Sequence, residues 1–345
     1  MRQYVKFLVF FISTIAFNCH HEGHASNFTI GDLFIASSVT DEVRYYDSAT
    51  LAFKGAFTHD LFNYEAERPN EYRYGPNGMA FNHRGHLVVA AYDYFVEFSE
   101  PGVEYARYPK AFTESNENII FDNHGNMYTT TSTNGSNRLN QYHGADYSFW
   151  KTLSLPAGSG ELSGITFDDD LRFYIMSQND RNIHVMATTN DYSVFSHTDS
   201  FGVGDVAGLL EDLQINQDGE LLAAIGDVVK YNPDTGNILG SFDVTPDTDE
   251  VPVSITVDEF GAIYVADFQD GSGSVGADIF KFLPNGGGYD TISITDEELR
   301  GPFGLAIAGA QLPGGPPVQT PIPPTFLLLG GSFIGLLALK QRLGH

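Results

Sequence analysis

The sequence predicts an all-β fold built from repeated four-stranded units, and three features of the chain carry that prediction. A short pattern of strand, polar turn and second strand recurs five times in one frame. The copies follow one another at intervals of about 40 to 50 residues, which is the length of one blade in a β-propeller. A further hairpin pattern follows each copy. The five polar turns lie at residues 82–85, 122–125, 168–171, 216–219 and 258–261.

A sixth unit is divided between the two ends of the repeat region. Gly31–Ala36 and Val43–Asp47 read as the later strands of a blade, and no inner strand precedes them. Gly301–Ile307 supplies that strand, because it matches Gly75–Phe81 in register. Pairing the two ends would close the ring and remove an exposed sheet edge. We therefore predict a six-bladed β-propeller over residues 27–310, closed by its N- and C-terminal strands.

Composition limits the classes of partner. The formal net charge of −26 argues against nucleic acid or an anionic membrane surface, because both are polyanions. This charge is compatible with cation binding or with solubility outside the cell. The apolar content of 42% is sufficient for a packed core. Cys19 is the only cysteine, which excludes an intramolecular disulfide framework.

Residues 1–25 read as a secretory signal peptide. Arg2 and Lys6 precede the apolar run Phe7–Phe17, and the small residues Gly23 and Ala25 suit cleavage after Ala25. Cys19 offers a lipoprotein alternative, although the preceding residue is asparagine, where a small residue is expected. The sequence therefore predicts export.

The composition changes after residue 310. Residues 311–324 are rich in proline and glycine and read as an extended spacer. Within 325–345, Thr325–Leu339 is apolar, and Lys340 and Arg342 follow it. We predict a C-terminal hydrophobic helix of about 22 Å over the apolar run, short for a membrane but usable in a thin bilayer. Its basic end would remain cytoplasmic.

This three-part tail resembles the PEP-CTERM class of bacterial sorting signals. The proline motif contains Pro321, Pro323 and Pro324, with isoleucine where the class usually has glutamate. The resemblance implies recognition and cleavage by an exosortase-like sorting protease. The protein would be anchored transiently in the inner membrane and then reach the cell surface or the extracellular matrix. A plain C-terminal membrane anchor is the alternative.

The ring itself resembles NHL-type propellers and the related gluconolactonase-like propellers. The motifs that carry the resemblance are Pro76–Phe81, Asp122–Tyr128 and Tyr264–Asp267. This likeness covers the whole ring. It is a pattern of turns and apolar positions, so it is specific for the fold and says little about function.

The position just before each inner strand is where such propellers place functional groups. It is occupied here by polar residues on one arc and by apolar residues opposite, in the order Asn77, Glu117, Ser163, Glu211, Val253 and Phe303. The resemblance to gluconolactonase-like propellers implies that Asn77, Glu117 and Glu211 bind a divalent cation. Oxygen ligands suit calcium or magnesium, and such an ion would polarise a lactone carbonyl. Asp212 either joins this site or adds to the acidic surface.

Two functions follow from these observations. The first is a binding or scaffold module whose polysaccharide or protein ligand is held on the ring face or in the channel mouth, with polar strand ends that face a solvated channel. The second is a divalent-cation-dependent hydrolase that uses Asn77, Glu117 and Glu211. The region after residue 25 contains no nucleophile motif, phosphate loop or Cys/His zinc spacing. We therefore favour the binding module.

Overall fold

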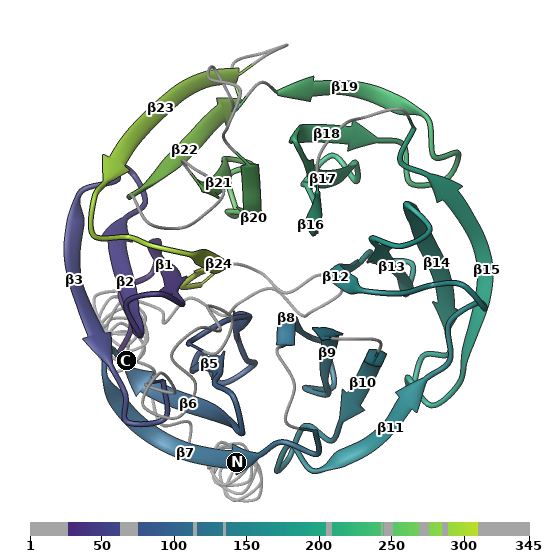
Figure 1. The fold of residues 1–345 in the computed structure, drawn as a ribbon, viewed down its shortest axis with the longest axis horizontal. Helices are drawn as coiled ribbons and strands as arrows, with labels where there is room; N and C mark the ends of the chain where they lie inside the picture. The colour runs from purple at the N-terminus through teal and green to yellow at the C-terminus, as the bar shows by residue number, and fades with distance from the viewer. Residues whose placement is uncertain are drawn as a thin grey trace, which may run out of the picture.

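A computed structural model describes most of the repeat region. The described residues are 27–62, 75–112, 116–133, 136–204, 209–242, 244, 251–268, 276–284 and 289–309. They form six four-stranded antiparallel sheets arranged around one axis (Figure 1), which confirms the predicted all-β, six-bladed propeller. Four features predicted from the sequence lie outside the described residues: the signal peptide at 1–25, the spacer at 311–324, the helix within 325–345 and the motif Pro321, Pro323 and Pro324.

Each blade contains an inner strand, two middle strands and an outer strand. The inner strands are β24 (Pro302–Ile307), β4 (Met79–Phe81), β8 (Asn116–Phe121), β12 (Leu162–Phe167), β16 (Leu210–Ile215) and β20 (Val251–Val257). The second strands are β1 (Asp32–Ser37), β5 (Leu87–Ala90), β9 (Met127–Thr133), β13 (Arg172–Ser177), β17 (Leu221–Ile225) and β21 (Ile263–Phe268). The third strands are β2 (Glu42–Asp47), β6 (Tyr94–Glu100), β10 (Ser136–Tyr142), β14 (Asn182–Thr188), β18 (Asp227–Tyr231) and β22 (Ala277–Pro284). The outer strands are β3 (Phe53–Thr58), β7 (Val103–Pro109), β11 (Phe149–Leu153), β15 (Phe195–Gly202), β19 (Ile238–Phe242) and β23 (Tyr289–Asp296).

The first blade joins segments from opposite ends of the described chain. Its strand order is β24-β1-β2-β3. β24 runs antiparallel to β1, with Leu33 opposite Ile307 and Ile35 opposite Leu305. We number the blades from this one, so that blade 2 begins with β4 and blade 6 with β20. Within the described part of the chain, no helix is both long and apolar enough to cross a membrane.

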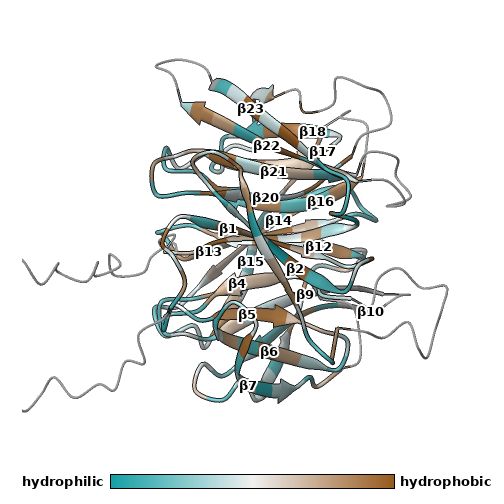
Figure 2. Ribbon diagram, turned by 90° about the vertical axis from the view of Figure 1, so that its left-hand side faces the viewer, coloured by the Kyte–Doolittle hydropathy of each residue, from teal (hydrophilic) through white to brown (hydrophobic). Residues whose placement is uncertain are grey.

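The hydrophobic core lies between the blades. Six apolar clusters, one for each pair of neighbouring blades, are formed by described residues. Between blades 1 and 2, for example, Phe28, Phe34 and Phe81 meet edge to face, with ring centroids 5.1 to 5.6 Å apart. Apolar residues concentrate on the inner and middle strands, and Figure 2 shows this for β5 and β6 against the more polar outer strand β7. Burial between blades therefore holds the ring together.

A repeated carboxylate organises the turn after the inner strand. Asp122 Oδ1 accepts the backbone N–H groups of His124 at 2.9 Å and Asn126 at 2.8 Å. Asp122 Oδ2 accepts the Tyr128 hydroxyl at 2.9 Å. Blades 4 and 6 repeat these bonds with Asp168 and Asp258, whose hydroxyl donors are the tyrosines six residues later, Tyr174 and Tyr264. This bonding explains why the turn motif recurs in the sequence.

Blades 2 and 5 use asparagine at the turn, and their next strand has an apolar residue in place of the tyrosine. Asn82 Oδ1 still accepts two backbone N–H groups, and its amide group donates to Glu97 at 2.9 Å. Blade 4 lacks the turn glycine, and Leu171 adopts the left-handed conformation there, with φ of 63°. The degenerate copy therefore keeps the same turn at the cost of backbone strain.

Candidate functional site

The inner strands are irregular at the positions where the sequence predicts ligands. The pairing of β8 with β9 skips Glu117, that of β16 with β17 skips Glu211, and that of β20 with β21 skips Val253. Blade 2 has the same feature, because Asn77 N–H donates to the Ala90 carbonyl while Ala90 N–H donates to the Gly78 carbonyl. Such bulges place an extra residue in one strand and redirect the side chains next to it.

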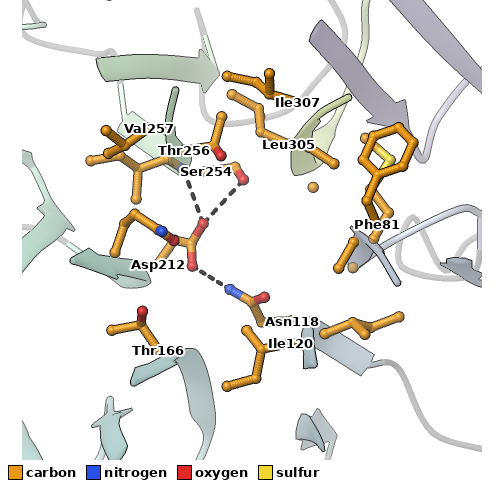
Figure 3. A pocket seen from close by; sticks show the side chains of 18 of the residues that line it. Phe81, Asn118, Ile120, Thr166, Asp212, Ser254, Thr256, Val257, Leu305 and Ile307 are labelled. Carbon is orange, nitrogen blue, oxygen red and sulfur yellow. Dashed lines mark hydrogen bonds between the residues drawn. The ribbon is translucent and has the colours of Figure 1, made fainter. Parts of the chain in front are cut away.

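As a consequence, the residue that follows the predicted position lines the axial cavity in five of the six blades. The cavity has a volume of about 110 Å³, and its lining includes Gly78, Asn118, Asp212, Ser254 and Gly304 (Figure 3). Asp212 is the one ionisable side chain among the described residues that line it. The predicted ligands Asn77, Glu117 and Glu211 are each followed directly in the chain by one of these lining residues.

The three predicted ligands have different surroundings. Asn77 is buried, and Glu211 is half-buried. Glu117 lies on β8, and its side chain is outside the described residues. No group of three His, Cys, Asp or Glu side chains that suits a metal ion occurs among the residues whose positions are described. The cation site at Asn77, Glu117 and Glu211 therefore stays a prediction.

Asp212 connects three blades at the axis, as the dashed lines in Figure 3 show. Its Oδ1 accepts the Asn118 side-chain amide from blade 3 and its neighbour Leu213 N–H at 2.8 Å. Its Oδ2 accepts two groups of blade 6, the Ser254 hydroxyl at 3.2 Å and the Ile255 N–H at 3.0 Å. Both carboxylate oxygens are thus occupied by donors from the protein itself.

Glycine on the intervening and opposite blades makes room for this network. A Cβ atom at Gly164 of blade 4 would lie 2.5 Å from the Leu213 nitrogen. At Gly78 it would lie 2.9 Å from the Asn118 Cα, and at Gly304 it would lie 2.5 Å from the Asn77 carbonyl oxygen. Real side chains do not approach backbone atoms so closely, so these three positions require glycine. The inner strands can therefore meet near the axis.

Burial dominates the electrostatics of Asp212. The residue is only 5% exposed, and this burial raises the pKa of Asp212 to about 7, against the opposing effect of its four hydrogen bonds. The neutral carboxyl group still fits the site, because its carbonyl oxygen accepts and its O–H can donate to Ser254. Asp212 is therefore suited to joining strands in either protonation state.

A second hollow, of about 580 Å³, lies among the turns of blades 4, 5 and 6. Its lining includes the carboxylates of Asp169, Asp170 and Glu259 and the guanidinium of Arg172. Arg172 already pairs with Asp168, at 2.7 Å, and with Asp234. The hollow is open and acidic, and Arg172, the one cationic side chain among the described residues that line it, is paired with carboxylates of the protein.

Solved structures of low sequence identity share this architecture. A protein of unknown function from Bacteroides caccae matches with a TM-score of 0.60 at 10% identity, over 81% of this chain and 98% of that one. A structure of a nidogen/laminin complex matches with a TM-score of 0.58 at 15% identity, over 80% and 98%. A putative gluconolactonase matches with a TM-score of 0.52 at 16% identity, over 70% and 86%. The structural similarity supports the propeller fold, and the low sequence identity leaves the function open.

No protein-family model matches the sequence, and no curated protein matches it either. Asn118, Asp212 and Ser254 are the axial polar residues that the sequence analysis did not select as a set. One signal was available, because glycine occupies the corresponding position at 78, 164 and 304, which marks that register as the one nearest the axis.

Proposed function

We propose that this protein is an exported bacterial propeller that acts as a binding or scaffold module at the cell surface or in the extracellular matrix. The observation that supports a binding module most strongly is the state of Asp212. Its two oxygens accept four hydrogen bonds from three blades, and no acceptor position of this carboxylate is left for a substrate or a cation.

Because the Asp212 carboxylate is occupied in this way, we place recognition on the faces of the ring. Inner strands that are pinned to one another form a rigid platform, and connecting loops on such a platform commonly carry binding residues. The ligand would be a polysaccharide or a protein, and one similar solved structure is itself a protein complex of nidogen with laminin. The charge of −26 disfavours nucleic acid as the ligand.

Export and sorting form the second half of the proposal. The signal peptide at 1–25 would direct secretion, and the tail at 311–345 would hold the protein briefly in the inner membrane. An exosortase-like protease would then recognise the motif at Pro321, Pro323 and Pro324 and release the ring. The support is the order of proline motif, apolar run and basic end in the sequence.

Sorting is tested with the full chain in a bacterium that has an exosortase, with a tag inserted after Ala25. Joint substitution Pro321→Ala, Pro323→Ala and Pro324→Ala should leave full-length protein in the membrane fraction. The matched control, Pro313→Ala, Pro316→Ala and Pro317→Ala in the same spacer, should be processed and released. Equal processing of both triple variants would refute the sorting motif, and a wild type that stays uncleaved would indicate a plain anchor.

Binding is tested by co-sedimentation of the released ring with exopolysaccharide purified from the producing cells. We expect saturable binding that a chelator does not reverse and that the variant Asp212→Asn retains, because the ligand would contact a face of the ring. Absence of binding would leave a protein as the proposed ligand. Binding that chelation abolishes would contradict a cation-independent module.

The alternative is a divalent-cation-dependent hydrolase that uses Asn77, Glu117 and Glu211. It is favoured by the bulges, since all three residues occupy the same irregular position on their inner strands. Calorimetric titration of calcium and magnesium into wild type, Glu117→Ala and Glu211→Ala tests it, with Glu161→Ala as the control. Binding that both substitutions abolish and the control retains would support the hydrolase.

A further inference from the structure

A second connected group of polar side chains lies on blade 4, away from the axis. His184, on β14, is only 2% exposed. Its Nε2 lies 2.9 Å from Ser159 Oγ, and its Nδ1 lies 2.8 Å from Ser200 Oγ. Ser200 Oγ in turn lies 2.7 Å from Nε2 of the exposed His197. These contacts join an exposed histidine to a half-buried serine through a buried histidine.

The contacts fit a chain of hydrogen bonds that all point the same way. If His184 carries its proton on Nδ1, it donates to Ser200, and the Ser200 hydroxyl donates to His197. The unprotonated Nε2, which also lies 3.1 Å from Asp180 Oδ2, then accepts the Ser159 hydroxyl. A hydroxyl bonded to an imidazole nitrogen, with the imidazole oriented by a third group, is the arrangement that activates a serine nucleophile.

Asp180 provides a place for the transferred proton to be stabilised. Its Oδ2 lies 3.1 Å from His184 Nε2, so an Nε2–H formed by proton transfer would face a carboxylate. Its Oδ1 is buried and has no hydrogen-bond partner among the described residues. Burial lowers the pKa of His184, although Asp180 opposes the effect. The neutral imidazole that a general base requires is therefore favoured at neutral pH.

The backbone around Ser159 leaves space for a reactant. Gly158 and Gly160 flank the serine, so no neighbouring side chain along the chain crowds its hydroxyl. Gly158 has a φ of 99°, and a Cβ placed there would meet no atom within 4 Å among the described residues. The connector between blades 3 and 4 thus presents Ser159 in a small open turn.

We infer that Ser159 and His184 form a nucleophile and general-base pair that cleaves carboxylic esters. Ser159 Oγ would bond to the ester carbonyl carbon while His184 Nε2 takes the hydroxyl proton. The alcohol would leave with that proton as the C–O bond breaks. Water, deprotonated by His184, would then attack the acyl carbon of the acyl-serine, and His184 would return that proton to Ser159 Oγ as the bond from the acyl carbon to Oγ breaks and the acid is released. This activity is separate from the proposed binding function and lies away from the axial cavity.

The sequence alone did not indicate this pair. Ser159 lies on the connector into blade 4 and His184 on the third strand of that blade, so no short motif contains both. The fold brings them together because the connector runs beside the turn after β13, where Asn179 N–H donates to the Gly160 carbonyl at 3.2 Å.

The full chain is treated with a fluorophosphonate, which forms an Oγ–P bond with an activated serine and releases fluoride. We expect one phosphonyl adduct on wild type, mapped to Ser159 by peptide mass spectrometry. Ser159→Ala should take no adduct, and the control Ser148→Ala should be labelled like wild type. His184→Gln, shown to be folded by circular dichroism, should slow labelling about 100-fold. Hydrolysis of p-nitrophenyl acetate should follow the same order.

Two outcomes would overturn the inference. One is wild type without an adduct at Ser159. The other is labelling of folded His184→Gln at the wild-type rate. Ser200 is a positioning residue in this scheme, so Ser200→Ala should slow labelling and Ser200→Thr, which keeps the hydroxyl, should restore it. If Ser200 served only in packing, the two substitutions would change the labelling rate equally.

Discussion

Two buried carboxylates, Asp122 and Asp212, accept hydrogen bonds in different parts of the fold, one within a single hairpin and the other between blades. Each accepts four hydrogen bonds. The donors to Asp122 all come from its own hairpin, within six residues. The donors to Asp212 come from blades 3, 5 and 6. Asp122 therefore shapes one turn, whereas Asp212 couples blades that are distant in the sequence.

Because their donors differ in this way, we expect removal of the Asp212 carboxylate to reduce stability more than removal of the Asp122 carboxylate. Asp122 is itself fully buried, but the turn residue His124 next to its hairpin donors is exposed, so water can reach those local donors once the carboxylate is removed. Three of the donors to Asp212 belong to the buried residues Leu213, Ser254 and Ile255, and an unsatisfied buried donor costs about 1–3 kcal/mol. The following predictions test this contrast, from the largest expected effect to the smallest.

Asp212→Ala should lower the free energy of unfolding by about 5 kcal/mol, because it leaves several enclosed donors without an acceptor. Asp122→Ala should cost about half as much. Urea denaturation of both variants at pH 7, monitored by circular dichroism, measures the two values. Equal losses would show that coupling between the blades adds nothing to stability.

The titration of Asp212 should make the ring less stable as the pH rises. Burial raises the folded pKa of Asp212 to about 7, above the value of 3.8 for an unburied aspartate, so its stabilising contribution is complete below pH 3.8 and is lost as the pH rises through 7. The loss should approach about 4 kcal/mol by pH 9. The measurement is the difference in unfolding free energy between wild type and Asp212→Asn from pH 4 to pH 9, in which other groups cancel. A difference independent of pH would contradict the raised pKa.

Gly164→Ala should destabilise the ring by about 2–3 kcal/mol, because its methyl group would collide with the backbone at Asp212 and Leu213. Gly240→Ala is the matched control. Its Cβ would meet only Lys230 Cε, at 3.8 Å, and its effect should be within about 0.5 kcal/mol of wild type. Thermal denaturation of the two variants provides the comparison. A tolerated Gly164→Ala would mean that the inner strands are not closely packed at the axis.

The tyrosine hydroxyl that donates to the turn aspartate should make the smallest contribution to the free energy of unfolding. Tyr128→Phe, Tyr174→Phe and Tyr264→Phe each remove one hydroxyl bonded to the turn aspartate. Each should cost about 1 kcal/mol in chemical denaturation. Similar values in the three blades would support a repeated local device, and widely different values would argue against it.

The contrast between the local bonds of Asp122 and the long-range bonds of Asp212 also explains which parts of the fold could be predicted from the sequence. The Asp122 turn uses residues at fixed short spacings, and the copies at 168 and 258 repeat them, so the blade count followed from the pattern. Leu171 occupies the turn position where the other copies have glycine. The hydrogen bonds of Asp168 hold this turn even with a leucine at positive φ.

The axial residues could not be read in this way. Their identity depends on bulges at Glu117, Glu211 and Val253, and a bulge changes which side chain reaches the axis without changing the apolar pattern that follows it. The partners of Asp212 also lie on blades far away in the sequence. The proposed pair of Ser159 and His184 could not be predicted for a related reason, since a connector and a strand meet only in the folded chain.

A double-mutant cycle between Asn118 and Asp212 tests the central claim, that the axial network ties separate blades together, most directly. Unfolding free energies of wild type, Asn118→Ala, Asp212→Ala and the double variant give the interaction energy. We predict a coupling of about 1–3 kcal/mol. The cycle of Asp212→Ala with Tyr128→Phe, which shares no hydrogen bond with it, should be additive within about 0.5 kcal/mol. Additivity in both cycles would contradict the claim.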